Sequence, residues 1–155
     1  MNAIPATIYQ MIDKKLRRRE TLKQRAEARL ERAKMKAGSN GLLVGPAGRH
    51  RSTADPTGRH ATSIAAAENY LKRTMQWLNV FEAVDRIYPD STDEGAAARM
   101  IYGKGMSQQE VCAATGCTRS TIRRRVDSYI FRVALLAAAE GLINKRELSR
   151  ECGTD

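Results

Sequence analysis

Residues 106–133 read MSQQEVCAATGCTRSTIRRRVDSYIFRV, and this stretch decides the fold because it predicts two helices joined by a tight turn. Ser107 and Glu110 have the spacing of a capping box at the start of the first helix. Gly116 suits a turn at positive φ, which a residue with a Cβ resists. Thr118 then caps the second helix. The pattern predicts a helix-turn-helix arrangement within an all-α fold.

The second predicted helix is apolar on one face and rich in arginine on the other. Its apolar stripe, at helical spacing, consists of Ile122, Val126, Tyr129, Ile130 and Val133. On a helical wheel Ser120, Arg124 and Asp127 lie opposite this stripe, and Arg123 and Arg125 lie at its flanks. In helix-turn-helix proteins the N-terminal part of the second helix enters the major groove of DNA. A solvated αα-hairpin is the alternative, but packing does not call for five arginines in fourteen residues.

Two sets of DNA contacts follow from these positions. Contacts with base edges are predicted for Ser120, Arg123, Arg124 and Asp127, since arginine on guanine is the commonest specific contact. Contacts with phosphates, which position the helix, are predicted for Gln108, Thr118, Arg119 and Arg125.

Composition and charge agree with a polyanionic partner. The chain has 155 residues, a length that fits one domain, or one domain with an arm. Its net charge is +10. Residues 1–36 contain 11 Lys and Arg against 4 Asp and Glu. Aromatic residues make up only 5%, which disfavours a stacking platform for single strands. No nucleophile or carboxylate cluster is evident, so we expect no enzymatic activity and no cofactor.

The cysteines and the hydropathy pattern bear on metal binding and on the cellular location of the protein. Cys112, Cys117 and Cys152 form no CxxC pair and have no nearby histidine, so we expect neither a zinc site nor any other metal site. No apolar run is long enough to span a membrane. The N-terminus lacks the apolar core of a signal peptide. We therefore expect a cytoplasmic, nucleoid-associated protein with no membrane partner.

Three segments are predicted along the chain: a basic helical arm at 1–36, a linker at 37–61, and a helical domain at 62–155 with its helix-turn-helix at 107–133. The arm reads as one long helix over 7–36, and the linker contains the unit P-x-G-R-H twice, at 46–50 and 56–60. Each unit suits a type I turn. Candidate accessory contacts to nucleic acid are Arg17, Arg18, Arg19, Arg49, His50, Arg59 and His60. The alternatives are a solvated or dimerising arm, and a flexible linker whose repeat is accidental.

A long helix is predicted over 62–88, and its apolar face changes midway. Ile64, Ala67, Leu71, Met75 and Leu78 share one face, whereas Trp77, Val80, Val84 and Tyr88 lie about 180° away. A helix with two apolar faces packs against two different bodies. We expect the second face to join the helix-turn-helix bundle. The first face is expected to meet the N-terminal helix or a second copy, which predicts a homodimer or a larger homo-oligomer.

The sequence also resembles known families. Residues 106–133 resemble the DNA-binding helix pair of bacterial sigma factors (region 4). The longer run AARMIYGKGMSQQEVCAATGCTRSTIRRRVDSYIFRVALL is similar to the C-terminal half of phage late transcription regulators of the ArpU/RinA-like type. This resemblance implies a sequence-specific double-stranded DNA-binding activator of phage late genes, with host RNA polymerase as a further partner.

Other phage proteins offer alternatives. Some phage Q-type antiterminators, which act on RNA polymerase, have a comparable layout. A small terminase subunit for DNA packaging is a further alternative, since such subunits also recognise DNA through a helix-turn-helix. The run RRRETLKQRAEARLERAK at 17–34 is similar to the arginine-rich RNA-binding helices of lambda N-type antiterminators.

Overall fold

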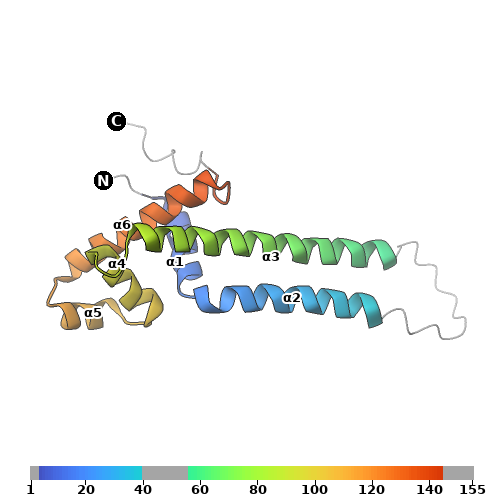
Figure 1. Cartoon of the computed structure of the whole chain (residues 1–155), viewed down its shortest axis with the longest axis horizontal. Coiled ribbons are helices and arrows are strands. Elements are labelled where there is room, and N and C mark those ends of the chain that lie inside the picture. Colours follow the sequence, from blue (N-terminus) through green and yellow to red (C-terminus); the bar gives the residue numbers. More distant parts are fainter. Residues whose placement is uncertain (1–3, 40–55, 145–155) are drawn as a thin grey trace, which may run out of the picture. The chain divides into compact units, whose positions relative to one another are not determined.

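The computed structural model describes residues 4–39 and 56–144, and over these residues it is all-α, with helices and no strand. The all-α class expected from the sequence is therefore confirmed. Figure 1 shows the helices α1 (Ala6–Leu16), α2 (Arg19–Ser39), α3 (Pro56–Ile87), α4 (Asp93–Ala98), α5 (Gln108–Thr115) and α6 (Arg119–Ala139). A π-helical turn, η1 (Arg99–Gly103), continues from α4.

Two compact units make up the described chain. We call the first, within Met1–Arg19 and Gln76–Asp155, the helix-pair unit, because it contains α5 and α6. The second, within Glu20–Met75, is called the hairpin unit. Helix α3 contributes its C-terminal part to the helix-pair unit and its N-terminal part to the hairpin unit.

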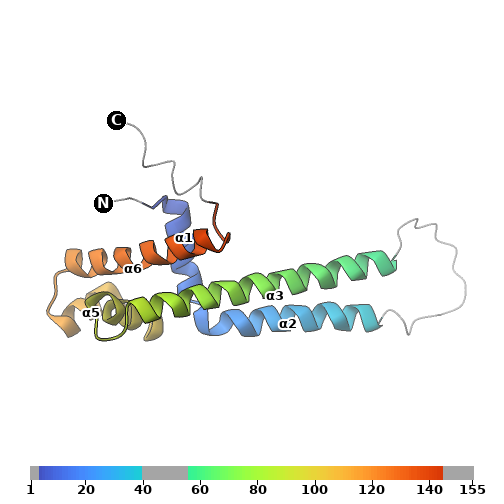
Figure 2. The same cartoon turned by 45° about the horizontal axis from the view of Figure 1, so that its top comes forward.

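The core of the helix-pair unit is built around α6, which α1, α4 and α5 all contact. The predicted stripe of α6 is confirmed, because all five of its residues are buried. The largest side chains packed with it and shielded from solvent are Phe81 and Val84 of α3, Ile12 and Leu16 of α1, and Val111 of α5. Figure 2 shows α1 crossing α6 rather than running beside it.

Helix α4 is short, and a glycine allows its close approach to the preceding turn. Thr92 caps it by accepting a hydrogen bond from the Gly95 N–H at 3.1 Å. A Cβ on Gly95 would lie 2.3 Å from the carbonyl oxygens of both Tyr88 and Pro89. The following η1 turn buries Ile101 and lets the Tyr102 hydroxyl donate to Asp13 of α1 at 2.9 Å.

The prediction of one continuous helix over 7–36 is wrong, because the chain turns at Arg17–Arg18 between α1 and α2. The Arg18 N–H bonds the Lys15 carbonyl, three residues back, instead of continuing the α-helical pattern. No glycine or proline marks this position, and arginine is a good helix former. Tertiary contacts on either side hold the break: Asp13 is tied to Tyr102, and Arg19 is tied to Asp85 of α3.

The hairpin unit pairs α2 with the N-terminal part of α3, which run side by side in opposite directions in both views (Figures 1 and 2). Its buried apolar side chains are small apart from one leucine: Leu22, Ala26, Ala33 and Ala67. The Arg29 guanidinium lies over the Tyr70 ring, 4.8 Å from its centroid. Helix α2 thus covers the N-terminal apolar face of α3 only in part, since Ala67 is buried whereas Leu71 is half-buried and Met75 is exposed.

The predicted linker at 37–61 is too long at both ends. Helix α2 extends to Ser39, and α3 already begins at Pro56. The second P-x-G-R-H unit is therefore helical and not a type I turn, with its proline at the first helical position, which proline favours. The first unit, with Arg49 and His50, lies outside the described residues.

The change of buried face along α3 is confirmed, but the residues buried on the two faces are not all those predicted. Trp77, Val80, Phe81 and Val84 are buried in the helix-pair unit, and Ala67 and Thr74 are buried in the hairpin unit. Met75, expected on the first apolar face, is 37% exposed. The neighbouring Thr74 is polar but buried. Its hydroxyl can be buried because it donates a hydrogen bond to the Tyr70 carbonyl at 2.9 Å.

Candidate nucleic-acid interface

The two helices predicted to bind DNA have the predicted ends. The Ser107 Oγ accepts from the Glu110 N–H at 3.3 Å, and Glu110 Oε2 accepts from the Ser107 N–H at 2.7 Å. The bond from the Ser107 N–H, followed by the interaction with the Ser107 side chain, favours the carboxylate and lowers the pKa of Glu110. Gly116 has φ +68° and returns its N–H to the Cys112 carbonyl at 2.9 Å. The capping box and the left-handed glycine turn are thus confirmed.

The start of α6 is also capped as expected. The Thr118 Oγ1 accepts from the Thr121 N–H at 3.3 Å and lies 3.0 Å from the Ser120 Oγ. The hydroxyl of Thr118 is therefore engaged in holding the helix end. Ile122 faces the core, fully buried. The opposite face of the first two turns is consequently turned to solvent.

This solvent-facing surface carries four of the side chains predicted to contact DNA: Arg119, Ser120, Arg123 and Arg124, all exposed. The Arg123 side chain is 75% exposed. Among the described residues Arg124 has no ion-pair partner. A capped helix end with exposed guanidinium groups is suited to bind phosphates and guanine edges.

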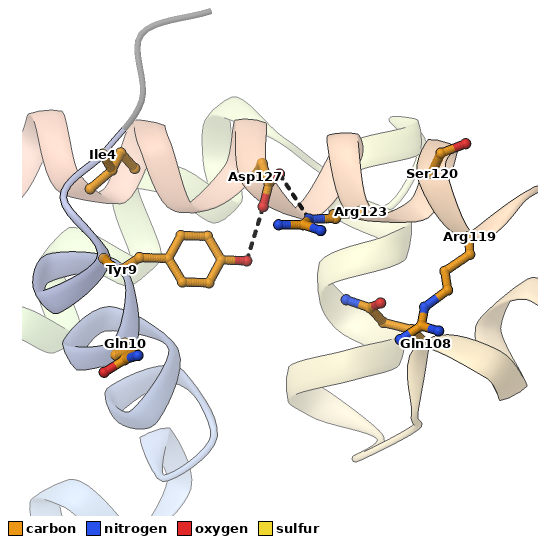
Figure 3. Close-up of a pocket in the computed structure, with 9 residues that line it drawn as sticks. Ile4, Tyr9, Gln10, Gln108, Arg119, Ser120, Arg123 and Asp127 are labelled. Atoms are coloured by element: carbon orange, nitrogen blue, oxygen red, sulfur yellow. Dashed lines mark hydrogen bonds and ion pairs between the residues drawn. The ribbon is translucent and has the colours of Figure 1, made fainter. Parts of the chain in front are cut away.

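Asp127, predicted to contact a base, is engaged by another helix. The Tyr9 hydroxyl of α1 donates to Asp127 Oδ1 at 2.9 Å, and the Arg123 Nε lies 3.9 Å from Oδ2 (Figure 3). Burial, followed by this bond to a carboxylate, raises the pKa of the Tyr9 hydroxyl. Both oxygens of Asp127 therefore have partners, although 42% of its side chain is exposed.

Arg125, predicted to contact a phosphate, turns towards the protein. Its guanidinium pairs with Asp93 at the start of α4 and donates to the Cys117 Sγ at 3.3 Å. Its side chain is only 22% exposed. Arg125 thus ties α4 and the α5–α6 turn to α6.

A groove separates α1 from the helix pair, with a volume of about 690 Å³. Ile4, Ala6, Tyr9 and Gln10 line one side, and Gln108, Arg119, Ser120, Arg123 and Asp127 line the other. In Figure 3 Tyr9 reaches from α1 towards Asp127 and Arg123 of α6. Tyr9 and Gln10 were not among the contact residues predicted from the sequence. The polar positions of α1 carry no pattern that distinguishes a groove from solvent.

Tyr9 belongs to a recurring arrangement in the helix-pair unit. In each case an aspartate accepts from a tyrosine of a distant segment and lies beside an arginine. The three sets are Tyr9–Asp127–Arg123, Tyr102–Asp13–Arg17 and Tyr129–Asp85–Arg19. Burial is the largest cause of the raised pKa of all three tyrosines. These joints fasten α1 to α6 and η1, and α3 to α6.

The candidate accessory residues differ in whether their side chains are paired within the protein or exposed. Arg17 pairs with Asp13 at 3.0 Å, and Arg19 pairs with Asp85 at 2.6 Å and lies over the Phe81 ring. Both therefore help to hold the helix-pair unit together. Arg18 and Arg59 are exposed. His60 is half-buried in the first turns of α3.

Comparison of the chain with protein-family models, with curated proteins and with solved structures found no match. None of the helices in residues 4–39 and 56–144 has the length and hydropathy needed to cross a bilayer. Within the same ranges His, Cys, Asp and Glu side chains form no group of three that could hold a metal ion.

Proposed function

We propose that this chain is a sequence-specific double-stranded DNA-binding protein that regulates transcription, with α5 and α6 acting as a helix-turn-helix. The observation that carries the proposal is the exposed basic face of the first two turns of α6. Capped helix ends and the Gly116 turn hold this face in a fixed orientation beside α5. A rigid element is what base readout needs, because misplaced donors lose geometric complementarity to the base edges.

The structure narrows the set of residues proposed to read bases. Ser120, Arg123 and Arg124 are exposed on the leading face of α6 and remain candidates. Asp127 is occupied by Tyr9 and Arg123, so we assign it to orienting Arg123 rather than to a cytosine. Arginine held by a carboxylate approaches guanine in a defined direction.

The residues proposed to contact phosphates are likewise fewer than those predicted from the sequence. Gln108 and Arg119 lie at the mouth of the groove and remain available. Arg125 is turned inward, and the Thr118 hydroxyl is used by its cap. We therefore assign phosphate contacts to Gln108 and Arg119.

The biological setting we propose is activation of phage late genes, and it rests on the resemblance of residues 93–140 to the ArpU/RinA-like regulators. Host RNA polymerase is the protein partner that this setting implies. A selection of bound sites from random duplexes, followed by transcription from a promoter bearing the selected site, tests both parts. Bound sequences without a common site would remove the readout claim.

The decisive variant is Arg124→Ala, measured by fluorescence anisotropy on the selected site and on a random duplex. Loss of one bidentate arginine contact costs about 1–3 kcal/mol on the specific site and much less on random DNA. Arg132→Ala is the matched control, because Arg132 is exposed on α6 beyond the proposed interface. Equal losses on both duplexes would assign Arg124 to a phosphate instead.

A further inference from the structure

The groove between α1 and the helix pair has been given no role so far. Ser120 and Arg123, two of the three residues proposed to read bases, line it, and Arg124 does not. Its volume of about 690 Å³ lies in the range of binding clefts, roughly 300–1,000 Å³. One wall is the start of α5 and α6, and the other is α1. DNA bound by Ser120 and Arg123 would therefore lie close to α1.

The place where α1 meets α6 is set by Asp127, eight residues after the first residue of α6. At a rise of 1.5 Å per residue, about 12 Å of α6 is free before the Tyr9 joint. The major groove is about 8.5 Å deep and about 12 Å wide, so one helix fills it. The free part of α6 is about as long as the groove is wide, so α1 is expected beside the phosphates that border the groove.

The charge of the groove suits a phosphate backbone. The α1 wall contributes Ile4, Ala6, Tyr9 and Gln10, which carry no negative charge. The lone carboxylate among the described lining residues is Asp127, and both of its oxygens are engaged by Tyr9 and Arg123. Arg119 and Arg123 supply positive charge from the opposite wall. An amide such as Gln10 can donate to a phosphate oxygen.

We propose that this groove holds one phosphodiester strand of the bound duplex, with Gln10 on the α1 side and Gln108 and Arg119 on the α6 side. The inference rests on the proposed DNA-binding function and adds α1 as a second wall of the interface. Tyr9 is a positioning residue here, because its bond to Asp127 holds α1 against α6 at the edge of the groove. The α1 helix therefore contributes affinity without sequence information.

The test is a pair of opposite charge changes at one exposed position, Gln10→Glu and Gln10→Lys, in the full chain. Gln10→Glu is expected to weaken binding about fivefold on both the selected and the random duplex, since two like charges close together in water repel on that scale. Gln10→Lys is expected to tighten binding and to steepen the slope of log K against log salt by about one.

The matched control is Asn79→Asp, which makes the same amide-to-carboxylate change at an exposed position of α3. Asn79 lies beside Leu136 and Glu140 at the far end of α6. The affinity of the Asn79→Asp variant for both duplexes is expected to equal that of the wild type. Circular dichroism of each variant verifies that the helices are retained.

Other outcomes separate the inference from the function on which it rests. Wild-type affinity for both Gln10 variants, alongside a weakened Arg124→Ala, would show that no strand lies in the groove. Tighter binding by Tyr9→Phe would show that α1 blocks the interface, because the variant only releases the bond to Asp127. If Arg124→Ala has no effect and no site is selected, the proposed function itself fails.

Discussion

Arg124 and Arg125 are neighbours in sequence, and we expect their replacement by alanine to have opposite consequences. Arg124 is exposed on α6, whereas the Arg125 side chain is 22% exposed and pairs with Asp93. Arg125→Ala should therefore destabilise the helix-pair unit and leave the DNA affinity of the folded protein nearly unchanged. Arg124→Ala should weaken specific binding and leave the stability nearly unchanged.

The magnitude for Arg125→Ala follows from what its side chain contacts. Replacement by alanine keeps Cβ and removes the two methylenes Cγ and Cδ, whose burial is worth about 0.8 kcal/mol each, or about 1.6 kcal/mol together. The ion pair adds less than about 1 kcal/mol, since the Asp93 side chain is 70% exposed. The gain in helix propensity on changing arginine to alanine is small. A loss of about 2 kcal/mol in the free energy of unfolding is expected.

Urea unfolding followed by the fluorescence of Trp77 measures this loss. Trp77 is the one tryptophan of the chain and is 5% exposed in the helix-pair unit, so its signal reports that unit. The midpoint should fall with an unchanged slope. Asp93→Ala should cost less than about 1 kcal/mol, because the arginine stem stays packed.

DNA binding is measured on the same samples at a temperature where each is folded. The structural role of Arg125 is excluded if Arg125→Ala unfolds like the wild type and loses affinity on specific and random duplexes alike. That result would return Arg125 to the phosphate contact predicted from the sequence, and would mean that its pairing with Asp93 does not persist in solution.

Two further predictions concern stability and assembly. Gly95→Ala should destabilise the protein by about 1–3 kcal/mol in urea unfolding, because its Cβ would meet two backbone carbonyl oxygens that no rotamer change can move aside; Gly38→Ala, with nothing within 4 Å of the added Cβ, should be neutral or stabilising by up to about 1 kcal/mol. We also expect a homodimer or larger oligomer through residues 62–79, where Met75 is 37% exposed and Leu71 half-buried, so sedimentation should show Met75→Asp shifted towards the monomer. A wild-type monomer would contradict the second prediction, and a ring of eight or more copies would favour the packaging alternative.

Much of the helix pair was predictable from the sequence because its determinants are local. Ser107 and Glu110 cap α5 from three residues apart, and Gly116 adopts the left-handed conformation that a side chain would strain. The stripe of α6 repeats at helical spacing, so its buried face can be identified without knowing its partners. Signals of this kind act over a turn or two of helix.

What only the tertiary structure decided depends on residues far apart in the chain. Tyr9 and Asp127 are 118 positions apart, Tyr102 and Asp13 are 89 apart, and Arg19 lies 66 positions from Asp85. No periodicity relates such pairs, because their meeting depends on how whole helices cross. For that reason the break at Arg17–Arg18 and the inward turn of Arg125 could not be predicted from the sequence. The polar joints formed where the helices cross decide which arginines remain exposed on the surface that we propose binds DNA.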